Sequence, residues 1–362
     1  MQKILSLLRT CNRSKDLTQD LQRTDDQMIL MKTLILAEND VKRLLSMEEV
    51  MEAVELAFAE QGTKRTQISP KAYLSYRKYN GDIRTMSSYL EGLDISAVEV
   101  SNVHEDNRAK FKMPTMMATI IMIEPKNGAP IAIIGGTHIA AMRTGAAGGV
   151  AARHLARKDS RIVGLIGAGA QAKTQLMALL TLLGSLEEVR VWSRTKQTRE
   201  EFLAYVKKEQ GKRITRVVPV ERPEDAVRGS DIIVTATPSK APVVLGDWIK
   251  PGTHLNCIGA DAPGKQELDP AILKKAKVVV DDLEHASYSS EISVPLSQGL
   301  LNLKDVWGSL GEIVAGLKKG RASDDEITVF ASTGLAVQDA VTANIAYKKA
   351  MAHGLGQMIE LL

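Results

Sequence analysis

The spacing of apolar residues predicts an α+β region in the first part of the chain. Apolar side chains at positions 47, 50, 51, 54, 57 and 58 would share one face of a helix over 47–60. Ser46 and Glu49 have the Ser-x-x-Glu spacing that caps a helix N-terminus. Asn127-Gly128 between two apolar runs predicts a hairpin, because this dipeptide favours tight turns between antiparallel strands. Strand-like runs occur at 71–76, 95–103, 116–123 and 131–134.

From Arg143 onward, strands and helices alternate. Such alternation favours an α/β fold, in which a parallel sheet carries helices on both faces. An apolar stripe at positions 306, 310, 313, 314 and 317 predicts a further helix that ends at Gly320. The predicted strands are 162–166, 189–192, 216–220, 232–236, 254–258, 277–280 and 327–330, and the other predicted helices are 170–183, 197–208, 223–228 and 335–352.

Composition narrows the class of protein. The chain has 362 residues, enough for about two domains, and a formal net charge of only +4. With 4% aromatic residues, neither charge nor stacking platforms favour a nucleic-acid partner. No apolar run approaches the ~20 residues of a membrane helix. Two cysteines exclude a disulfide framework and favour a cytoplasmic protein. Residues 1–30 mix basic and acidic side chains without apolar periodicity, so a disordered extension is expected.

A glycine-rich turn points to a dinucleotide. Gly167-Ala-Gly169-Ala-Gln-Ala172 follows an apolar strand and opens a predicted helix, the context that a dinucleotide-binding fingerprint requires. Gly167 would permit the tight turn, and Gly169 would let the backbone approach a pyrophosphate at the helix N-terminus. A ligand-free turn is the alternative. The alternating pattern that continues beyond the turn favours the dinucleotide site.

The end of the next strand indicates which coenzyme is preferred. An NAD site usually offers Asp or Glu to the ribose 2′-hydroxyl about 20 residues beyond the glycines. Here the segment contains Ser193, Arg194, Thr195 and Lys196, with no carboxylate. These side chains could hold a 2′-phosphate, which favours NADPH over NADH. The alternative is that Arg194 and Lys196 are solvated loop charges.

One carboxylate follows a predicted sheet strand and is a candidate for catalysis. Asp261 lies just beyond strand 254–258, and ligands of open α/β sheets bind outside the carboxyl ends of the strands. A carboxylate there could exchange protons or hold an ammonium group; the alternative is a loop-capping role. The six histidines lack metal-ligand spacing, so no metal site is predicted.

Four segments together resemble one family. They are Arg143-Thr-Gly-Ala-Ala-Gly-Gly, Gly167-Ala-Gly-Ala-Gln-Ala, Ile258-Gly-Ala-Asp-Ala-Pro-Gly-Lys-Gln-Glu-Leu268 and Phe330-Ala-Ser-Thr-Gly334. The chain resembles the ornithine cyclodeaminase/mu-crystallin family from about Met31 to Gly354, and within it the archaeal-type alanine dehydrogenases. The resemblance implies a discontinuous α+β substrate and dimerisation domain, 31–148 plus 333–362, around a Rossmann NAD(P)-binding domain, 149–332.

The resemblance also implies roles for individual residues. Asp261 matches a catalytic or substrate-orienting carboxylate. Lys71 and Arg84 match substrate-binding positions, and Arg143 matches a residue near both the substrate carboxylate and the coenzyme. Coenzyme contacts are expected at Thr115, Arg143, Gly167, Gly169, Ala170, Gln171, Ser193, Arg194, Thr195, Thr237, Gly259, Lys265 and Ser332.

The chain departs from the family where a lysine usually transfers protons. The segment reads Ala97-Val-Glu99-Val-Ser-Asn-Val-His104, and Glu99 lies nearest to the lysine position. Glu99 could replace the lysine in proton transfer or face solvent as a strand-surface charge. If it lies near Lys71 and Arg84, these cations are expected to lower its pKa.

The expected function is an NAD(P)H-dependent oxidoreductase acting on a small α-amino or α-imino acid, like an alanine dehydrogenase or a ketimine reductase. One alternative is ornithine cyclodeaminase, which releases ammonia and forms proline. Another is a non-enzymatic, NADPH-binding protein like mu-crystallin. Apart from the small-molecule substrate, the expected partner is a second copy of the chain, in a homodimer.

Overall fold

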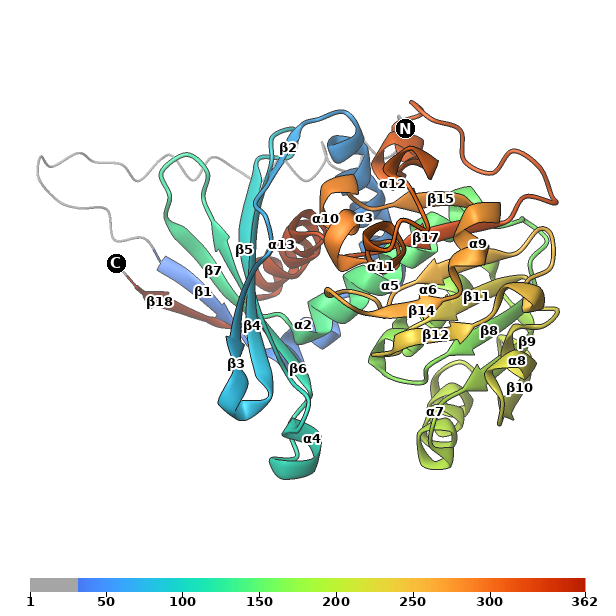
Figure 1. The fold of residues 1–362 in the computed structure, drawn as a ribbon. Coiled ribbons are helices and arrows are strands. Elements are labelled where there is room, and N and C mark those ends of the chain that lie inside the picture. The colour runs from blue at the N-terminus through green and yellow to red at the C-terminus, as the bar shows by residue number, and fades with distance from the viewer. Residues whose placement is uncertain (1–31, 362) are drawn as a thin grey trace, which may run out of the picture.

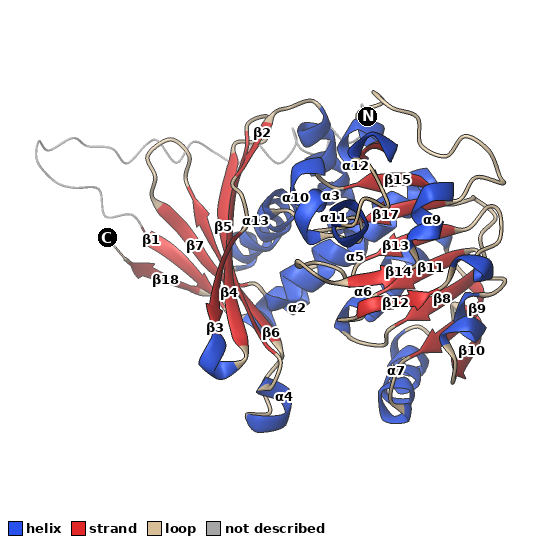
Figure 2. Ribbon diagram, in the orientation of Figure 1, coloured by secondary structure: helices blue, strands red, loops and turns tan. Residues whose placement is uncertain are grey.

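The computed structural model describes residues 32–361, and the extension expected at residues 1–30 lies outside this range. Within it, the chain forms two large sheets with a layer of helices between them (Figure 1). Figure 2 shows that the first sheet stands at one side of this helical layer and the second sheet, with its own helices, at the other. No helix in residues 32–361 is long and apolar enough to cross a membrane.

The first sheet is mostly antiparallel and contains both ends of the described chain. Its strands are β1 (Lys32–Leu36), β2 (Thr66–Ile68), β3 (Ala72–Tyr76), β4 (Gly81–Leu90), β5 (Ile95–His104), β6 (Met116–Ile123), β7 (Pro130–Gly135) and β18 (Gln357–Glu360). Their order is β18-β1-β7-β6-β5-β4-β2, with β3 also paired to β4. Only β1 and β7 pair in parallel among these described strands. The hairpin predicted at Asn127-Gly128 is confirmed as β6–β7, and Gly128 has the positive φ of +78° that its turn requires.

Helices α2 (Glu38–Leu44) and α13 (Ala336–His353) pack on the inner face of this sheet, and α3 (Met47–Gly62) packs on α13. The predicted cap of α3 is confirmed, because the Ser46 side chain accepts a hydrogen bond from the Glu49 amide at 3.4 Å. Helix α13 returns the end of the chain to the first sheet and packs against β5 and β4. Residues from the two ends of the chain therefore meet beneath one sheet.

The second sheet is entirely parallel. Its strands are β8 (Ile162–Ile166), β9 (Leu186–Trp192), β10 (Ile214–Val220), β11 (Ile232–Thr235), β13 (His254–Cys257), β15 (Lys277–Val280), β16 (Val306–Ser309) and β17 (Thr328–Ala331). The strand order is β10-β9-β8-β11-β13-β17-β15-β16. The chain adds β9 and β10 on one side of β8 and then crosses back to add β11 on its other side, as in a Rossmann-type fold. The predicted α/β class is confirmed. Two further strands, β12 (Lys240–Val244) and β14 (Gln266–Leu268), pair beside it.

Helices flank the second sheet and connect it to the first. They are α5 (Thr137–Leu155), α6 (Ala170–Leu183), α7 (Lys196–Glu209), α8 (Pro223–Val227), α9 (Pro270–Lys275), α10 (Leu283–Ser289), α11 (Ser293–Ser297) and α12 (Leu310–Val314). The short helix α4 (Asn107–Lys110) instead connects β5 to β6 at the end of the first sheet. Helix α5 packs closely on α6, since a Cβ at Gly145 would lie 2.6 Å from the Thr174 carbonyl oxygen. The small residues after Arg143 thus let α5 approach the backbone of α6.

The helix predicted from the stripe between 306 and 317 is wrong. Val306–Ser309 is strand β16, paired with β15, and only Leu310–Val314 is helical. A capping box between Ser309 and Glu312 starts this helix, and Gly316, with φ +76°, follows its end. Leu317 is 64% exposed. Local hydrogen bonds at the two ends therefore override the apolar period.

Candidate active site

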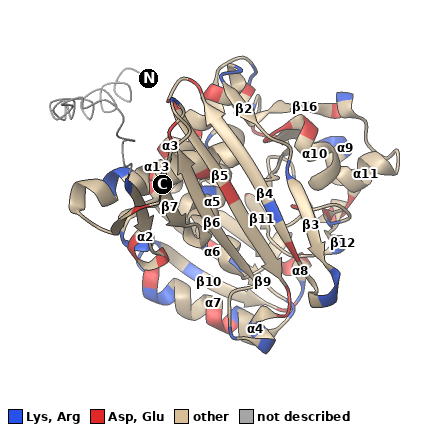
Figure 3. Cartoon of the chain, turned by 90° about the vertical axis from the view of Figure 1, so that its left-hand side faces the viewer, with Lys and Arg blue, Asp and Glu red and all other residues tan. Residues whose placement is uncertain are grey.

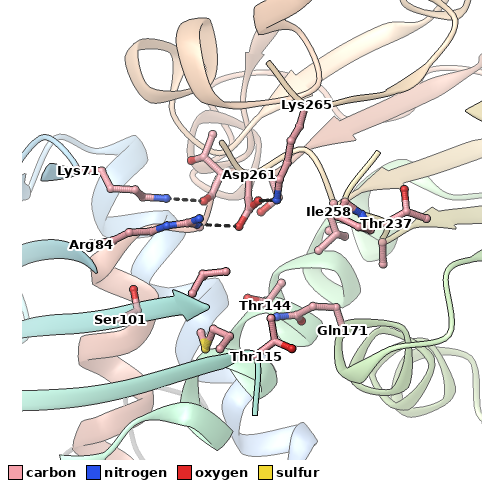
Figure 4. Close-up of a pocket in the computed structure, with 18 of the residues that line it drawn as sticks. Lys71, Arg84, Ser101, Thr115, Thr144, Gln171, Thr237, Ile258, Asp261 and Lys265 are labelled. Atoms are coloured by element: carbon pink, nitrogen blue, oxygen red, sulfur yellow. Dashed lines mark hydrogen bonds and ion pairs between the residues drawn. The ribbon is translucent and has the colours of Figure 1, made fainter. Parts of the chain in front are cut away.

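A cavity of about 740 Å³ opens between the two sheets and gathers side chains from distant parts of the sequence (Figure 4). The first sheet contributes residues of β4, β5 and β6 and of the adjoining loops. The second contributes the loops that follow β8, β9, β11 and β13. Of the predicted site residues, the cavity is lined by Lys71, Arg84, Glu99, Thr115, Arg143, Gln171, Arg194, Thr237, Gly259, Asp261, Lys265 and Ser332.

The turn after β8 has the geometry that a dinucleotide requires. Gly167 has φ +112°, and a Cβ there would lie 2.5 Å from the Ala236 carbonyl oxygen. Around Gly169, a Cβ would meet nothing within 4 Å, so the backbone is open to a ligand. Helix α6 begins directly afterwards at Ala170 and turns its N-terminus to this space. The turn does not line the cavity itself but lies beside Gln171, which does.

Of the predicted coenzyme contacts at the end of β9, Arg194 lines the cavity and Ser193 and Thr195 do not. Arg194 makes no ion pair among the described residues. Thr195 instead caps α7 by accepting a hydrogen bond from the Thr198 amide at 3.3 Å, and the Ser193 carbonyl accepts one from Arg199.

Asp261 lies between cations, on the side of the cavity formed by the loops of the second sheet. Lys265 Nζ is 2.6 Å from one carboxylate oxygen and Arg84 Nη1 is 3.1 Å from the other, as Figure 4 shows. Burial by itself would raise the pKa of Asp261, but Lys265, Arg84 and Lys71 outweigh it and lower the pKa to about 2. Asp261 is therefore an ionised carboxylate at neutral pH and cannot donate a proton.

Arg84 and Lys71 are held in place by the first sheet and by the loop after β17. Arg84 donates to both Asp82 oxygens, from Nε at 2.9 Å and from Nη2 at 3.1 Å. Lys71 Nζ donates to the Thr333 carbonyl at 2.9 Å. Burial lowers the pKa of Lys71, and Arg143 and Arg84 lower it further. Two cations thus face the cavity from positions that packing constrains.

Glu99 lies on the inner face of β5 and does not face solvent, because only 2% of the residue is exposed. Its Oε1 atom has no hydrogen-bond partner among the described residues. Burial raises the pKa of Glu99 to about 7 with the help of the Asp339 charge, although Arg143 and Lys71 oppose the rise. The predicted fall in this pKa is wrong, since the sequence reveals neither the dehydration of the site nor the nearby Asp339.

Asp339, on the first turns of α13, is a site residue that the sequence analysis missed. Arg143 Nε donates to Asp339 Oδ1 at 2.9 Å, and Arg143 Nη1 donates to the Gln338 side chain at 3.3 Å. Both polar residues are buried in an otherwise apolar stretch of the helix. An Asp among the apolar residues that open the predicted helix 335–352 was the signal available in the sequence, because a buried carboxylate needs a partner.

Two further buried carboxyl groups shape the loops around the cavity. Asp281 accepts hydrogen bonds from the amides of Thr333 and Gly334, at 2.6 and 2.8 Å, and so fixes the loop that receives Lys71. Glu267 accepts from the Thr237 amide at 2.7 Å and from the Gly259 amide at 2.9 Å. Glu267 thus joins the loops after β11 and β13, and Asp281, which follows β15, holds the loop after β17.

Comparisons with known proteins agree with this arrangement. A sequence model of the ornithine cyclodeaminase/mu-crystallin family matches residues 31–354. Alanine dehydrogenase of Archaeoglobus fulgidus is 44% identical over 330 residues, which cover 91% of this chain and 99% of that protein.

Two solved structures are similar over nearly the whole chain. An archaeal alanine dehydrogenase dimer with bound NAD has a TM-score of 0.85 and 43% identity, covering 92% of this chain and 100% of that one. Δ1-Pyrroline-2-carboxylate reductase of Thermococcus litoralis, in complex with NADH and L-proline, has a TM-score of 0.87 and 41% identity. That similarity covers 90% of this chain and 100% of the reductase chain.

Proposed function

The chain belongs to the ornithine cyclodeaminase/mu-crystallin family, and we propose that it interconverts a small α-amino acid and its α-imino acid with NAD(P)H. One observation carries this proposal: a single cavity beside the dinucleotide turn holds an ionised carboxylate, Asp261, and a carboxyl group that titrates near neutrality, Glu99. Oppositely shifted carboxyl groups divide acid–base roles between them. In this proposal, residues 149–332 hold the coenzyme, and residues 31–148 with 333–362 bind the substrate.

The residues present fit a nicotinamide dinucleotide. The open backbone at Gly169 and the N-terminus of α6 would receive the pyrophosphate, and Gln171, Thr237 and Gly259 would flank the nicotinamide half. Ser332 and Thr115 lie on the other walls of the same cavity. When bound, the nicotinamide supplies or accepts the hydride.

The charged side chains of the cavity suit an α-amino acid. Arg84, Lys71 and Arg143 offer cations to the substrate carboxylate, the group that guanidinium binds best. The ionised Asp261 would accept hydrogen bonds from the substrate nitrogen and hold the α-carbon at the coenzyme side. Glu99 would give a proton to the imino nitrogen in reduction and take one in oxidation, because its pKa near 7 permits both.

A substrate panel tests this function. Amino acids, and keto acids with ammonia, are assayed through the absorbance of the reduced nicotinamide. We expect coenzyme turnover with at least one small α-amino or α-imino acid. Ammonia release without net coenzyme change would instead indicate a cyclodeaminase, the activity named for one related solved structure at 30% identity. Tight NADPH binding without any turnover would contradict the proposal and favour a binding protein.

The coenzyme preference proposed is NADPH over NADH. No carboxylate follows β9 to hold a 2′-hydroxyl, and Arg194 is a cation without an ion pair among the described residues. Arg194→Ala should therefore weaken NADPH binding by about 1–3 kcal/mol and leave NADH binding nearly unchanged. Lys196→Ala is the matched control, since Lys196 pairs with Glu200 at 3.7 Å. Equal wild-type affinity for both coenzymes would contradict the preference.

A homodimer is the assembly proposed, and its interface is the outer face of the first sheet. Val98, Ile121 and Ile133 lie side by side across three strands of that face, where each is only partly buried. Figure 3 views this side and shows few charged residues along the strands. Ile121→Arg should yield monomers in light scattering, and an unchanged dimer would contradict this interface.

We also propose a cytoplasmic location, in which the buried Cys257 stays reduced.

A further inference from the structure

Asp339 and Glu99 form a buried pair of carboxyl groups on facing elements. Glu99 is on β5, Asp339 is on α13, and the two elements pack directly on each other. Only 2% of Glu99 and 1% of Asp339 is exposed. Oε1 of Glu99 and Oδ2 of Asp339 are both buried and have no hydrogen-bond partner among the described residues. Two carboxylates in such a site repel each other and cannot both be ionised at low cost.

The groups around Glu99 leave a proton as its simplest partner. Arg143 of α5 uses its guanidinium on Asp339 and Gln338, and Lys71, before β3, donates to the Thr333 carbonyl. On β5 itself, the Ser101 side chain hydrogen-bonds Glu99 and lowers its pKa, but Oε1 of Glu99 still has no partner among the described residues.

The other strands that flank β5 do not supply a cation to Glu99 either. On β4, Arg84 is paired with Asp82 and Asp261. Strand β6, the other neighbour, has no titratable side chain between Met116 and Ile123. Burial raises the pKa of Asp339 as well, but Arg143 forms its ion pair with Asp339 and acts on Glu99 only through its charge. This asymmetry favours the charge on Asp339 and the proton on Glu99.

We propose that Glu99 and Asp339 share one proton, and that Asp339 is a positioning residue that keeps Glu99 protonated for transfer to the substrate nitrogen. This inference rests on the function proposed above. It gives Asp339 a part in the reaction without contact to the substrate. In this chain, a carboxyl pair would then do the work for which the family resemblance implies a lysine.

The proton transfer balances within the proposed reaction. In reduction, a bound reduced nicotinamide would supply hydride, with its electron pair, to the α-carbon, and the C=N π electrons would move onto nitrogen. The Glu99 O–H bond breaks as an N–H bond forms on that nitrogen. Glu99 is left as a carboxylate beside the charged Asp339, and their repulsion favours uptake of a new proton from water. Oxidation of the amino acid runs these steps in reverse.

The pH dependence of reduction tests the pair. In the wild type, the rate should fall as pH rises through about 7, because Glu99 loses its proton. Asp339→Asn keeps a hydrogen-bond acceptor for Arg143 but removes the negative charge. The falling limb of the pH–rate profile, which is the decrease in rate as pH rises through about 7, should then move about one pH unit lower. This shift lowers the rate at alkaline pH about tenfold. Asp339→Glu restores the charge and should return the limb toward the wild-type pH.

Two other variants separate electrostatics from packing. Gln338→Met removes another contact of Arg143 without changing charge, so the limb should stay at its wild-type position. Glu99→Gln should abolish the limb. An infrared titration without coenzyme adds a readout independent of turnover. The band of a protonated carboxyl group that is present in the wild type and missing in Glu99→Gln belongs to Glu99. This band should disappear at a lower pH in Asp339→Asn than in the wild type.

The outcomes distinguish the two proposals. If Glu99→Gln leaves the pH profile unchanged, the proton-transfer role of Glu99 fails, and with it the proposed function as stated. If Glu99→Gln removes the limb but Asp339→Asn leaves the limb and the infrared titration unmoved, only the shared proton is overturned. A limb that moves equally in Gln338→Met would also overturn it, because Arg143 packing would then account for the shift.

Discussion

The two ends of the cavity place the same chemical group in opposite electrostatic settings. Asp261 has a side chain that is 37% exposed and is flanked by Lys265 and Arg84, so its pKa falls to about 2. Glu99 is 2% exposed and faces Asp339, so its pKa rises to about 7. The difference teaches that neighbours and water, and not the carboxyl itself, assign one group to hold charge and the other to exchange protons.

The largest expected effect is the loss of turnover in Asp261→Asn. The amide removes the charge that holds the substrate nitrogen, and charge-assisted hydrogen bonds contribute up to about 3 kcal/mol. We expect kcat/KM to fall by about 100-fold or more, with coenzyme affinity near the wild-type value in a fluorescence titration. Asp82→Asn is the matched control, because Asp82 binds the same Arg84 but does not line the cavity. An equal loss in both variants would assign the effect to the orientation of Arg84.

Glu99→Gln should change how stability depends on pH. The pKa of Glu99 is raised from 4.5 to about 7, so the folded state binds more protons between these values. The contribution to stability is therefore complete below pH 4.5 and is lost as pH rises through about 7. The free energy of unfolding of the wild type relative to Glu99→Gln should fall by about 3 kcal/mol across this window in urea titrations. A difference that does not vary with pH would show that Glu99 titrates normally.

The effect of Glu99→Gln on rate is smaller. Loss of the proton-transfer group should lower turnover about tenfold at neutral pH, which corresponds to about 1.4 kcal/mol of barrier. Glu99→Lys, which restores the residue type implied by the family, should move substrate preference toward alanine and pyruvate with ammonia. Steady-state kinetics over the substrate panel measure both changes. Wild-type rates in Glu99→Gln would make Glu99 a structural residue only.

The smallest effect is the acid stability of Asp261→Asn, which has the opposite sign. The pKa of Asp261 is lowered from 3.8 to about 2, so its contribution to stability is present above pH 3.8 and is lost as pH falls through about 2. Because the side chain is partly exposed, solvent screening should keep this difference below about 1 kcal/mol. Urea unfolding between these pH values measures it. A difference between wild type and Asp261→Asn that is no larger at neutral pH than in acid would contradict an ionised Asp261.

Local patterns predicted much of the fold. The Ser46 cap, the Asn127-Gly128 hairpin and the strand–turn–helix around Gly167 depend on residues close in sequence, and all three are confirmed. The segment 306–317 was predicted wrongly because an apolar period does not register the capping box at Ser309 or the strand pairing before it. Strands β4 and β18 were not predicted, since their pairing partners on β5 and β1 stabilise them more than their own pattern does.

The candidate site divides in the same way. The predicted residues that follow strands of the second sheet line one cavity, because the carboxyl ends of parallel strands meet at one edge of the sheet. Lys71, Arg84, Glu99 and Thr115 line it from the first sheet, and only the packing of the two sheets brings them there. Ser193 and Thr195 were also predicted as coenzyme contacts but do not line the cavity, and that assignment stays a prediction. Asp339, Asp281 and Glu267 were missed because each acts through contacts with segments far away in the chain.

The sequence by itself determined the family, the dinucleotide turn and the inventory of charged residues, because motifs and periodicity are local. Only the tertiary structure decided which charges face one another. A pKa depends on distance through space and on the exclusion of water, and neither follows from the order of residues. Packing α13 against β5 placed Asp339 beside Glu99 in a dry site, and packing the two sheets together placed Arg84 beside Asp261.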